Sequence, residues 1–175
     1  MEKKIKSEEI YSGKVIHVTK DTVECENGNI SYREAVYHNG GVCIGLRDGD
    51  YFFMVRQYRY VPNETLLEFP AGKIEKGEEP DKAILRECEE ETGYTCKNIK
   101  KLGHIIPTCG YSSERIYLYY GEVDEKIGQN FDFDEYMEIE KYTIEEIKKM
   151  IKDNVITDSK TICLVERMYL EGIIG

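Results

Sequence analysis

Polar residues alternate with β-branched or aromatic residues through most of the first 60 positions, a pattern that predicts antiparallel strands. The alternation is clearest in residues 14–25 and 30–38. Asn27, Gly28 and Asn29 separate these two runs and predict a hairpin turn. We therefore expect the chain to begin with a β-sheet region.

A second hairpin is expected after a break at Gly40 and Gly41. Residues 42–47 and 51–61 are rich in strand-forming side chains and flank a turn at residues 48–50. The same reading predicts further strands at residues 65–69, 97–106, 115–123 and 138–143.

Three helices are predicted among these strands. Pro80 suits a first helical turn and Gly93 a left-handed C-terminal cap, so the first helix should span about residues 80–92. A second helix should start at Thr143, because Glu146 has the spacing of a capping box. The third helix is expected at residues 159–172. Strands precede, surround and follow the first helix, so the expected fold class is α+β.

Composition and charge narrow the classes of function. The 175 residues carry a formal net charge of −10, which argues against a general nucleic-acid binder. No apolar run approaches the ~20 residues of a membrane span, and residues 1–13 lack the apolar centre of a signal peptide. We expect a soluble, cytoplasmic protein without membrane partners. Its six scattered cysteines are expected to be free thiols, most of them buried.

The predicted helix at residues 80–92 carries an unusual cluster of glutamates. At about 100° per residue, Glu87, Glu90 and Glu91 fall within an arc of roughly 100°, while Glu89 points away. Like charges at this spacing cost roughly 0.2–0.5 kcal/mol per pair. A bound Mg²⁺ or Mn²⁺ would reverse the sign of that effect, because hard cations prefer carboxylate oxygens. An ordinary solvated acidic helix is the alternative.

The residues around the cluster carry a resemblance that favours the metal site. The stretch from Gly72 to Tyr94 resembles the Nudix hydrolase signature, G-x5-E-x7-R-E-U-x-E-E-x-G-U, where U is a bulky aliphatic residue. All its fixed positions match: Gly72, Glu78, Arg86, Glu87, Glu90, Glu91 and Gly93. Cys88 and Tyr94 depart from it at the two aliphatic positions.

A longer stretch, about residues 30–170, is similar to ADP-ribose pyrophosphatases of this family. The resemblance implies an α/β/α sandwich over residues 41–175 and an additional N-terminal antiparallel sheet over residues 1–40 that is used in a homodimer. It also implies hydrolysis of the pyrophosphate bond of ADP-ribose, or of a related nucleoside diphosphate sugar, with Mg²⁺ or Mn²⁺ as cofactor. ADP-ribose would yield AMP and ribose 5-phosphate.

The resemblance also assigns metal ligands and a catalytic base. The carbonyl of Ala71 and the carboxylates of Glu87, Glu90 and Glu91 would hold the divalent metals. Glu135, with Asp134 as its alternative, would help to bind metal and accept the proton of the attacking water. Glu78 and Arg86 are expected to form a structural charged pair, with Arg86 also orienting the carboxylates.

Substrate contacts are assigned in the same way. Arg59 and Arg33 match residues that contact the phosphates or the terminal ribose, with Arg33 reaching into the partner subunit's site. Glu68 is expected at the mouth of the site. One departure concerns the substrate: Cys109 stands where ADP-ribose enzymes usually carry a proline, and Pro107 is the nearest proline.

Two alternatives to ADP-ribose hydrolysis stay open. Tyr111 lies about where hydrolases of dinucleoside polyphosphates place a marker tyrosine, although the chain has 14 tyrosines and chance explains the position better. The second alternative is a domain that senses ADP-ribose or a nucleotide without cleaving it. Such domains often lose glutamates of the signature, whereas this chain keeps them all.

Overall fold

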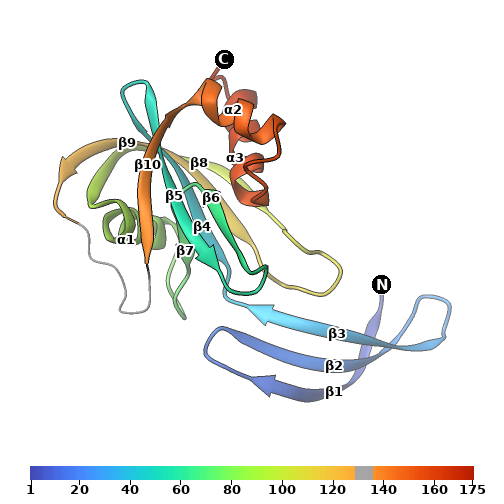
Figure 1. The fold of residues 1–175 in the computed structure, drawn as a ribbon. Coiled ribbons are helices and arrows are strands. Elements are labelled where there is room, and N and C mark those ends of the chain that lie inside the picture. The colour runs from blue at the N-terminus through green and yellow to red at the C-terminus, as the bar shows by residue number, and fades with distance from the viewer. Residues whose placement is uncertain (129–135) are drawn as a thin grey trace. The chain divides into compact units, whose positions relative to one another are not determined.

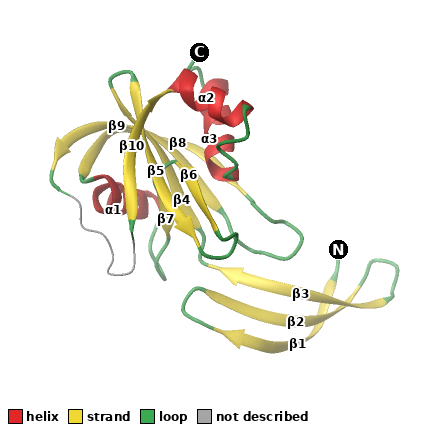
Figure 2. Cartoon of the chain, viewed as in Figure 1, coloured by secondary structure: helices red, strands yellow, loops and turns green. Residues whose placement is uncertain are grey.

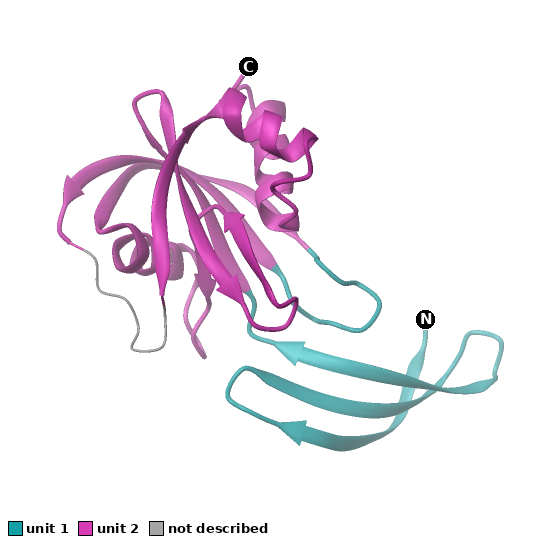
Figure 3. Ribbon diagram, in the orientation of Figure 1, with its two compact units in different colours: residues 1–40, 106–115 teal, residues 41–105, 116–175 magenta. Residues whose placement is uncertain are grey.

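The structure of the protein, a computed structural model, describes residues 1–128 and 136–175 (Figure 1). The chain forms two compact units, coloured separately in Figure 3: residues 1–40 with 106–115, and residues 41–105 with 116–175. A boundary between units therefore follows Gly40. Residues 106–115, which we expected in the second region, pack with the first unit.

The first unit is built on an antiparallel three-stranded sheet in the order β1-β2-β3. Its strands are β1 (Lys3–Ser12), β2 (Ile16–Glu24) and β3 (Ile30–His38). The predicted hairpin is confirmed, because Glu24 pairs with Ile30 on either side of the turn. Strand β1 was not predicted: all of its residues are exposed, so no buried face gives its sequence an alternating pattern.

The second unit contains a mixed seven-stranded sheet in the order β10-β5-β4-β9-β8, with β6 paired to β5 and β7 to β4. Strands β4 and β9 are parallel, and the other paired strands are antiparallel. The strands are β4 (Gly41–Asp48), β5 (Tyr51–Arg59), β6 (Glu64–Glu68), β7 (Ala71–Lys73), β8 (Tyr94–Ile105), β9 (Ile116–Lys126) and β10 (Met137–Thr143). The hairpin of β4 and β5 is as predicted, whereas the short β7 was missed.

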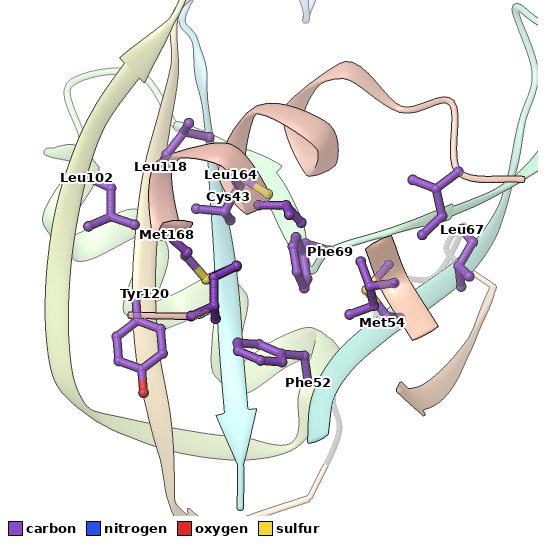
Figure 4. Close-up of a cluster of buried hydrophobic side chains, with 14 residues drawn as sticks. Cys43, Phe52, Met54, Leu67, Phe69, Leu102, Leu118, Tyr120, Leu164 and Met168 are labelled. Atoms are coloured by element: carbon purple, nitrogen blue, oxygen red, sulfur yellow. The ribbon is translucent and has the colours of Figure 1, made fainter. Parts of the chain in front are cut away.

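Helices cover both faces of this sheet, as Figure 2 shows. They are α1 (Pro80–Thr92), α2 (Ile144–Lys152) and α3 (Ser159–Leu170). Alternate residues of β4 serve the two sides: Val42 and Ile44 pack in a cluster with α1, while Cys43 packs in a cluster with α2 and α3 (Figure 4). The prediction of an α+β fold with an α/β/α sandwich and an additional N-terminal sheet is confirmed.

Two other expectations concern cysteines and membranes. All six cysteines are free thiols, but only Cys43 and Cys88 are buried, so the prediction that most of them are buried is wrong. Within residues 1–128 and 136–175, no helix is long and apolar enough to cross a membrane.

Candidate active site

Helix α1 has the predicted boundaries and caps. Pro80 occupies its first turn, and Gly93 has a φ of 75° and donates its N–H to the carbonyl of Glu89. Ala83, Ile84 and Cys88 are buried against the sheet, as the helical spacing requires. Leu85, next to Ile84 in the sequence, is 40% exposed, so the buried face of the helix is narrow.

The acidic side of α1 is less exposed than an ordinary solvated helix face. The side chain of Glu87 is 13% exposed and that of Glu90 is 39% exposed, while Glu91 as a residue is only 4% exposed. Carboxylates with so little solvent need partners, because an unpaired buried charge is costly. The partners come from one arginine of α1 and from the backbone of β7.

Arg86 is the arginine that holds two of these carboxylates. Its Nη1 lies 2.8 Å from Glu87 Oε1 and 2.9 Å from Glu90 Oε2. Its Nε and Nη2 donate to Glu78 at 3.1 and 3.0 Å, and Nη2 also donates to the carbonyl of Lys73 at 3.0 Å. The predicted pairing of Arg86 with Glu78 is therefore present, and the same guanidinium orients the glutamates.

Electrostatics agree with this arrangement. The hydrogen bonds to Glu78 raise the pKa of Arg86 above its ordinary value even though partial burial opposes the charge. In return, the hydrogen bonds from Arg86 lower the pKa of Glu78. Both groups are thus held ionised, which fixes the loop before α1 against the helix that carries the carboxylates.

Glu91 is tied to the strand that carries the predicted carbonyl ligand. The backbone N–H of Ala71 donates to Glu91 Oε2 at 2.9 Å. The next residue, Gly72, leaves room for Glu87: a Cβ at Gly72 would lie 1.9 Å from Glu87 Cδ. Strand β7 and helix α1 therefore bring Ala71 close to Glu87 and Glu91, although Ala71 lies 16 and 20 positions before them in the sequence.

The oxygen donors in this neighbourhood fit a hard divalent cation by their chemistry. Carboxylates and carbonyls are ligands that Mg²⁺ and Mn²⁺ prefer. Because Gly72 has no side chain, the Glu87 carboxylate can lie against the backbone of β7. Among the described residues, no group of three or more His, Cys, Asp or Glu side chains is already gathered as a metal site. A cation would compete with Arg86 for Glu87 and Glu90.

Arg59 and Glu68, both predicted to bind substrate, are in contact with each other. Arg59 donates to both oxygens of Glu68, from Nε at 2.8 Å and from Nη2 at 2.6 Å. Glu68 is 2% exposed, whereas the Arg59 side chain keeps 37% of its surface accessible. Burial alone raises the pKa of Glu68, but Arg59 and Lys160 outweigh it and leave that pKa below its ordinary value.

Lys160 is a residue that the sequence reasoning missed. Its ammonium contacts Glu68 and lies 2.9 Å from Asp158 Oδ1, with 12% of its side chain exposed. A signal was present, since Lys160 lies in the first turn of α3, where the helix dipole disfavours a cation. A lysine at such a position needs an anionic partner.

Arg33, Glu135 and Asp134 complete the set of predicted residues. Arg33 belongs to the first unit, where its Nε donates to Glu2 Oε2 at 3.0 Å and its Nη1 to the carbonyl of Tyr32 at 2.7 Å. Glu135 and its alternative Asp134 lie outside the described residues.

The chain is similar to a known family and to several known proteins. Residues 36–165 match the NUDIX domain. The ADP-ribose pyrophosphatase of Bacillus subtilis (strain 168) is 38% identical over 97% of this chain and 94% of that protein. The methanol dehydrogenase activator of Bacillus methanolicus is 39% identical over the same shares of the two chains.

More distant similarities extend the comparison. The GDP-mannose pyrophosphatase of Cronobacter sakazakii (strain ATCC BAA-894) is 27% identical over 90% of this chain and 88% of that protein. A crystal structure of an ADP compounds hydrolase superposes with a TM-score of 0.87, covering 98% of this chain and 95% of that one at 18% sequence identity. The structural likeness shows a shared fold.

Proposed function

The chain belongs to the NUDIX domain family, and from that premise we propose that it hydrolyses the pyrophosphate bond of ADP-ribose or of a related nucleoside diphosphate sugar. The observation that carries the proposal is the contact between α1 and β7, where Glu87 and Glu91 lie against Gly72 and Ala71. Similarity to an ADP-ribose pyrophosphatase over 97% of the chain supports this substrate class.

The proposed cofactor is Mg²⁺, with Mn²⁺ as a substitute, held by the carbonyl of Ala71 and by Glu87, Glu90 and Glu91. A divalent cation there would neutralise phosphate oxygens and lower the pKa of a bound water. The residues of the chain set the geometry. Arg86 orients Glu87 and Glu90, and the Ala71 N–H fixes Glu91.

The proton and the substrate are assigned to other residues. We propose that Glu135, or Asp134, accepts the proton of the water that attacks phosphorus, while the P–O bond to the departing phosphate breaks. Arg59 is proposed to contact the phosphates while it stays paired with Glu68, because part of its side chain is accessible to solvent. Arg33 is proposed to contact substrate from the partner subunit.

Removing divalent metal should abolish hydrolysis. We expect the protein to convert ADP-ribose into AMP and ribose 5-phosphate with Mg²⁺ present, and to lose that activity when a chelator is added. Only the products are substrates for an added phosphatase, so released inorganic phosphate measures turnover. Excess Mg²⁺ should restore the rate, and Mn²⁺ should substitute for it.

A substrate panel separates the proposal from its alternatives. ADP-ribose, GDP-mannose and diadenosine tetraphosphate should be compared at equal concentration, with product identification. A clear preference for the dinucleoside polyphosphate would indicate that the protein is a hydrolase of dinucleoside polyphosphates. Tight binding of ADP-ribose with no product formed would indicate a sensing domain.

We also propose that the protein is a cytoplasmic homodimer that uses its N-terminal sheet. The strand register places Tyr11, Ile16, Ile30 and Tyr32 on one face of that sheet. These four side chains are between 36% and 62% exposed, an apolar content that favours a protein partner. Identical surfaces on two copies satisfy the usual symmetry of a dimer.

The dimer is testable by light scattering after gel filtration. The measured mass should be about twice the 20.4 kDa of one chain. Replacing both Ile30 and Tyr32 by glutamate should shift the protein toward the monomer. A matched change at Tyr169, which is 55% exposed on α3, should leave the mass unchanged. A wild-type protein of monomeric mass would contradict the proposal.

A further inference from the structure

Four ionised side chains meet where β6 ends and α3 begins. Glu68 and Asp158 supply two negative charges, and Arg59 and Lys160 supply two positive ones. Lys160 contacts both acids, and Arg59 binds Glu68 through two nitrogens. The cluster is electrically balanced and largely buried, so removal of one member would leave an uncompensated charge in a poorly solvated place.

The first turn of α3 also holds the backbone of Phe69, the residue that follows Glu68. Thr161 is fully buried, and its hydroxyl accepts a hydrogen bond from the Phe69 N–H at 2.9 Å while donating to Asp158 Oδ2 at 2.6 Å. Asp158 in turn caps the helix by accepting from the Thr161 N–H at 2.9 Å. Helix α3 therefore fixes the side chain of Glu68 through Lys160 and the backbone N–H of Phe69 through Thr161.

Beyond Phe69 the chain is held from other directions. The carbonyl of Pro70 accepts from the Ile44 N–H at 2.9 Å, and the Ala71 N–H donates to Glu91 at 2.9 Å. Each residue from Glu68 to Ala71 thus has a partner, on α3 at one end and on α1 at the other. These helices pack against opposite faces of the sheet, so the segment 68–71 links the two layers.

We propose that Lys160 and Thr161 are positioning residues for the metal site: by fixing Glu68 and Phe69, they set where the Ala71 carbonyl stands relative to Glu91. The inference rests on the proposed function for the identity of the metal ligands. Neither residue is a ligand itself. A helix cap with no further role would make the same contacts, so the two roles must be separated by metal affinity and not by stability.

The isosteric change Thr161→Val separates them. It removes the hydroxyl that Phe69 N–H needs and keeps the shape of the side chain. We expect Mn²⁺ binding to the substrate-free protein, followed by electron paramagnetic resonance, to weaken by about tenfold, the size of effect that supporting contacts of metal ligands produce. Thr161→Ser keeps the hydroxyl and should bind Mn²⁺ as the wild type does.

A charge-balanced pair tests Lys160. Lys160→Met alone leaves two acids with one cation and is expected to lower the melting temperature. Adding Asp158→Asn removes the excess charge and keeps a residue that can cap α3. We expect the double variant to recover most of the melting temperature while Mn²⁺ binding stays about tenfold weaker, because Glu68 still lacks its lysine.

The outcomes distinguish this inference from the proposed function. If Thr161→Val melts early but binds Mn²⁺ with wild-type affinity, the positioning role is wrong and Thr161 only stabilises the fold. If the double variant regains full affinity, Lys160 has no positioning role. If the wild type binds Mn²⁺ and the variants weaken it, but no nucleoside diphosphate sugar is cleaved, the inference stands and the proposed substrate class fails.

Discussion

Replacing Glu91 by glutamine should lower turnover of ADP-ribose by about 10²- to 10⁴-fold, since tenfold in rate corresponds to about 1.4 kcal/mol and a metal site supplies several. The fold should survive. Glutamine keeps an oxygen that can accept the Ala71 N–H, now 2.9 Å from Glu91 Oε2, so the contact between α1 and β7 is retained. The negative charge is lost, and one carboxylate oxygen is replaced by an NH₂ group.

The matched control is Glu89→Gln, the same chemical change on the same helix. Glu89 points away from the other glutamates and is assigned no ligand role, so turnover should stay near the wild-type rate. Melting temperatures of both variants should be measured beside their rates. Near-normal activity of Glu91→Gln in a folded protein would refute the assignment of Glu91 as a metal ligand.

Much of the fold was predictable because local signals determine it. Helix α1 has the predicted boundaries, since Pro80 and Gly93 act through the backbone alone. The capping box of Thr143 and Glu146 is present with both of its hydrogen bonds. Strands β1 and β7 were missed, because one is exposed throughout and the other has only three residues. A strand without a buried face, or with only three residues, shows no periodic pattern of apolar residues.

The sequence predicted which residues form the candidate site better than it predicted the contacts between them. Helical geometry grouped Glu87, Glu90 and Glu91, whereas the orienting role of Arg86 came only from the resemblance to the family. The long arginine side chain reaches back to Glu87 and Glu90, which an angular count of Cα positions does not reveal. The burial of Glu91 depends on β7, a partner distant in the sequence.

The contacts of the charged side chains around Glu68 were also difficult to predict from the sequence. Arg59 and Glu68 lie in one hairpin, but Arg59 is opposite Glu64 in the strand register and reaches Glu68 through its long side chain. Lys160 lies 92 residues beyond Glu68, so only tertiary structure brings them together. The unfavourable place of a lysine in the first turn of α3 was the one local indication of a buried partner.

Gly72→Ala is expected to lower kcat/KM by about a hundredfold, the cost that a misplacement of roughly 1 Å can have in an active site. An added Cβ would lie 1.9 Å from Glu87 Cδ and 2.1 and 2.2 Å from its two oxygens, so the carboxylate must move. The backbone of Gly72 is not in the left-handed region, and alanine can adopt it. The loss of stability should therefore stay within about 1 kcal/mol.

A double-mutant cycle shows whether the loss acts through Glu87. In a Glu87→Ala background the clashing carboxylate is absent, so adding Gly72→Ala should change the rate by less than about twofold, as expected for coupled neighbours. Activity and melting temperature should be measured for all four proteins. If Gly72→Ala costs the same hundredfold with and without Glu87, the new methyl group blocks substrate or distorts β7. The glycine of the signature would then act on the strand instead of making room for a metal-binding carboxylate.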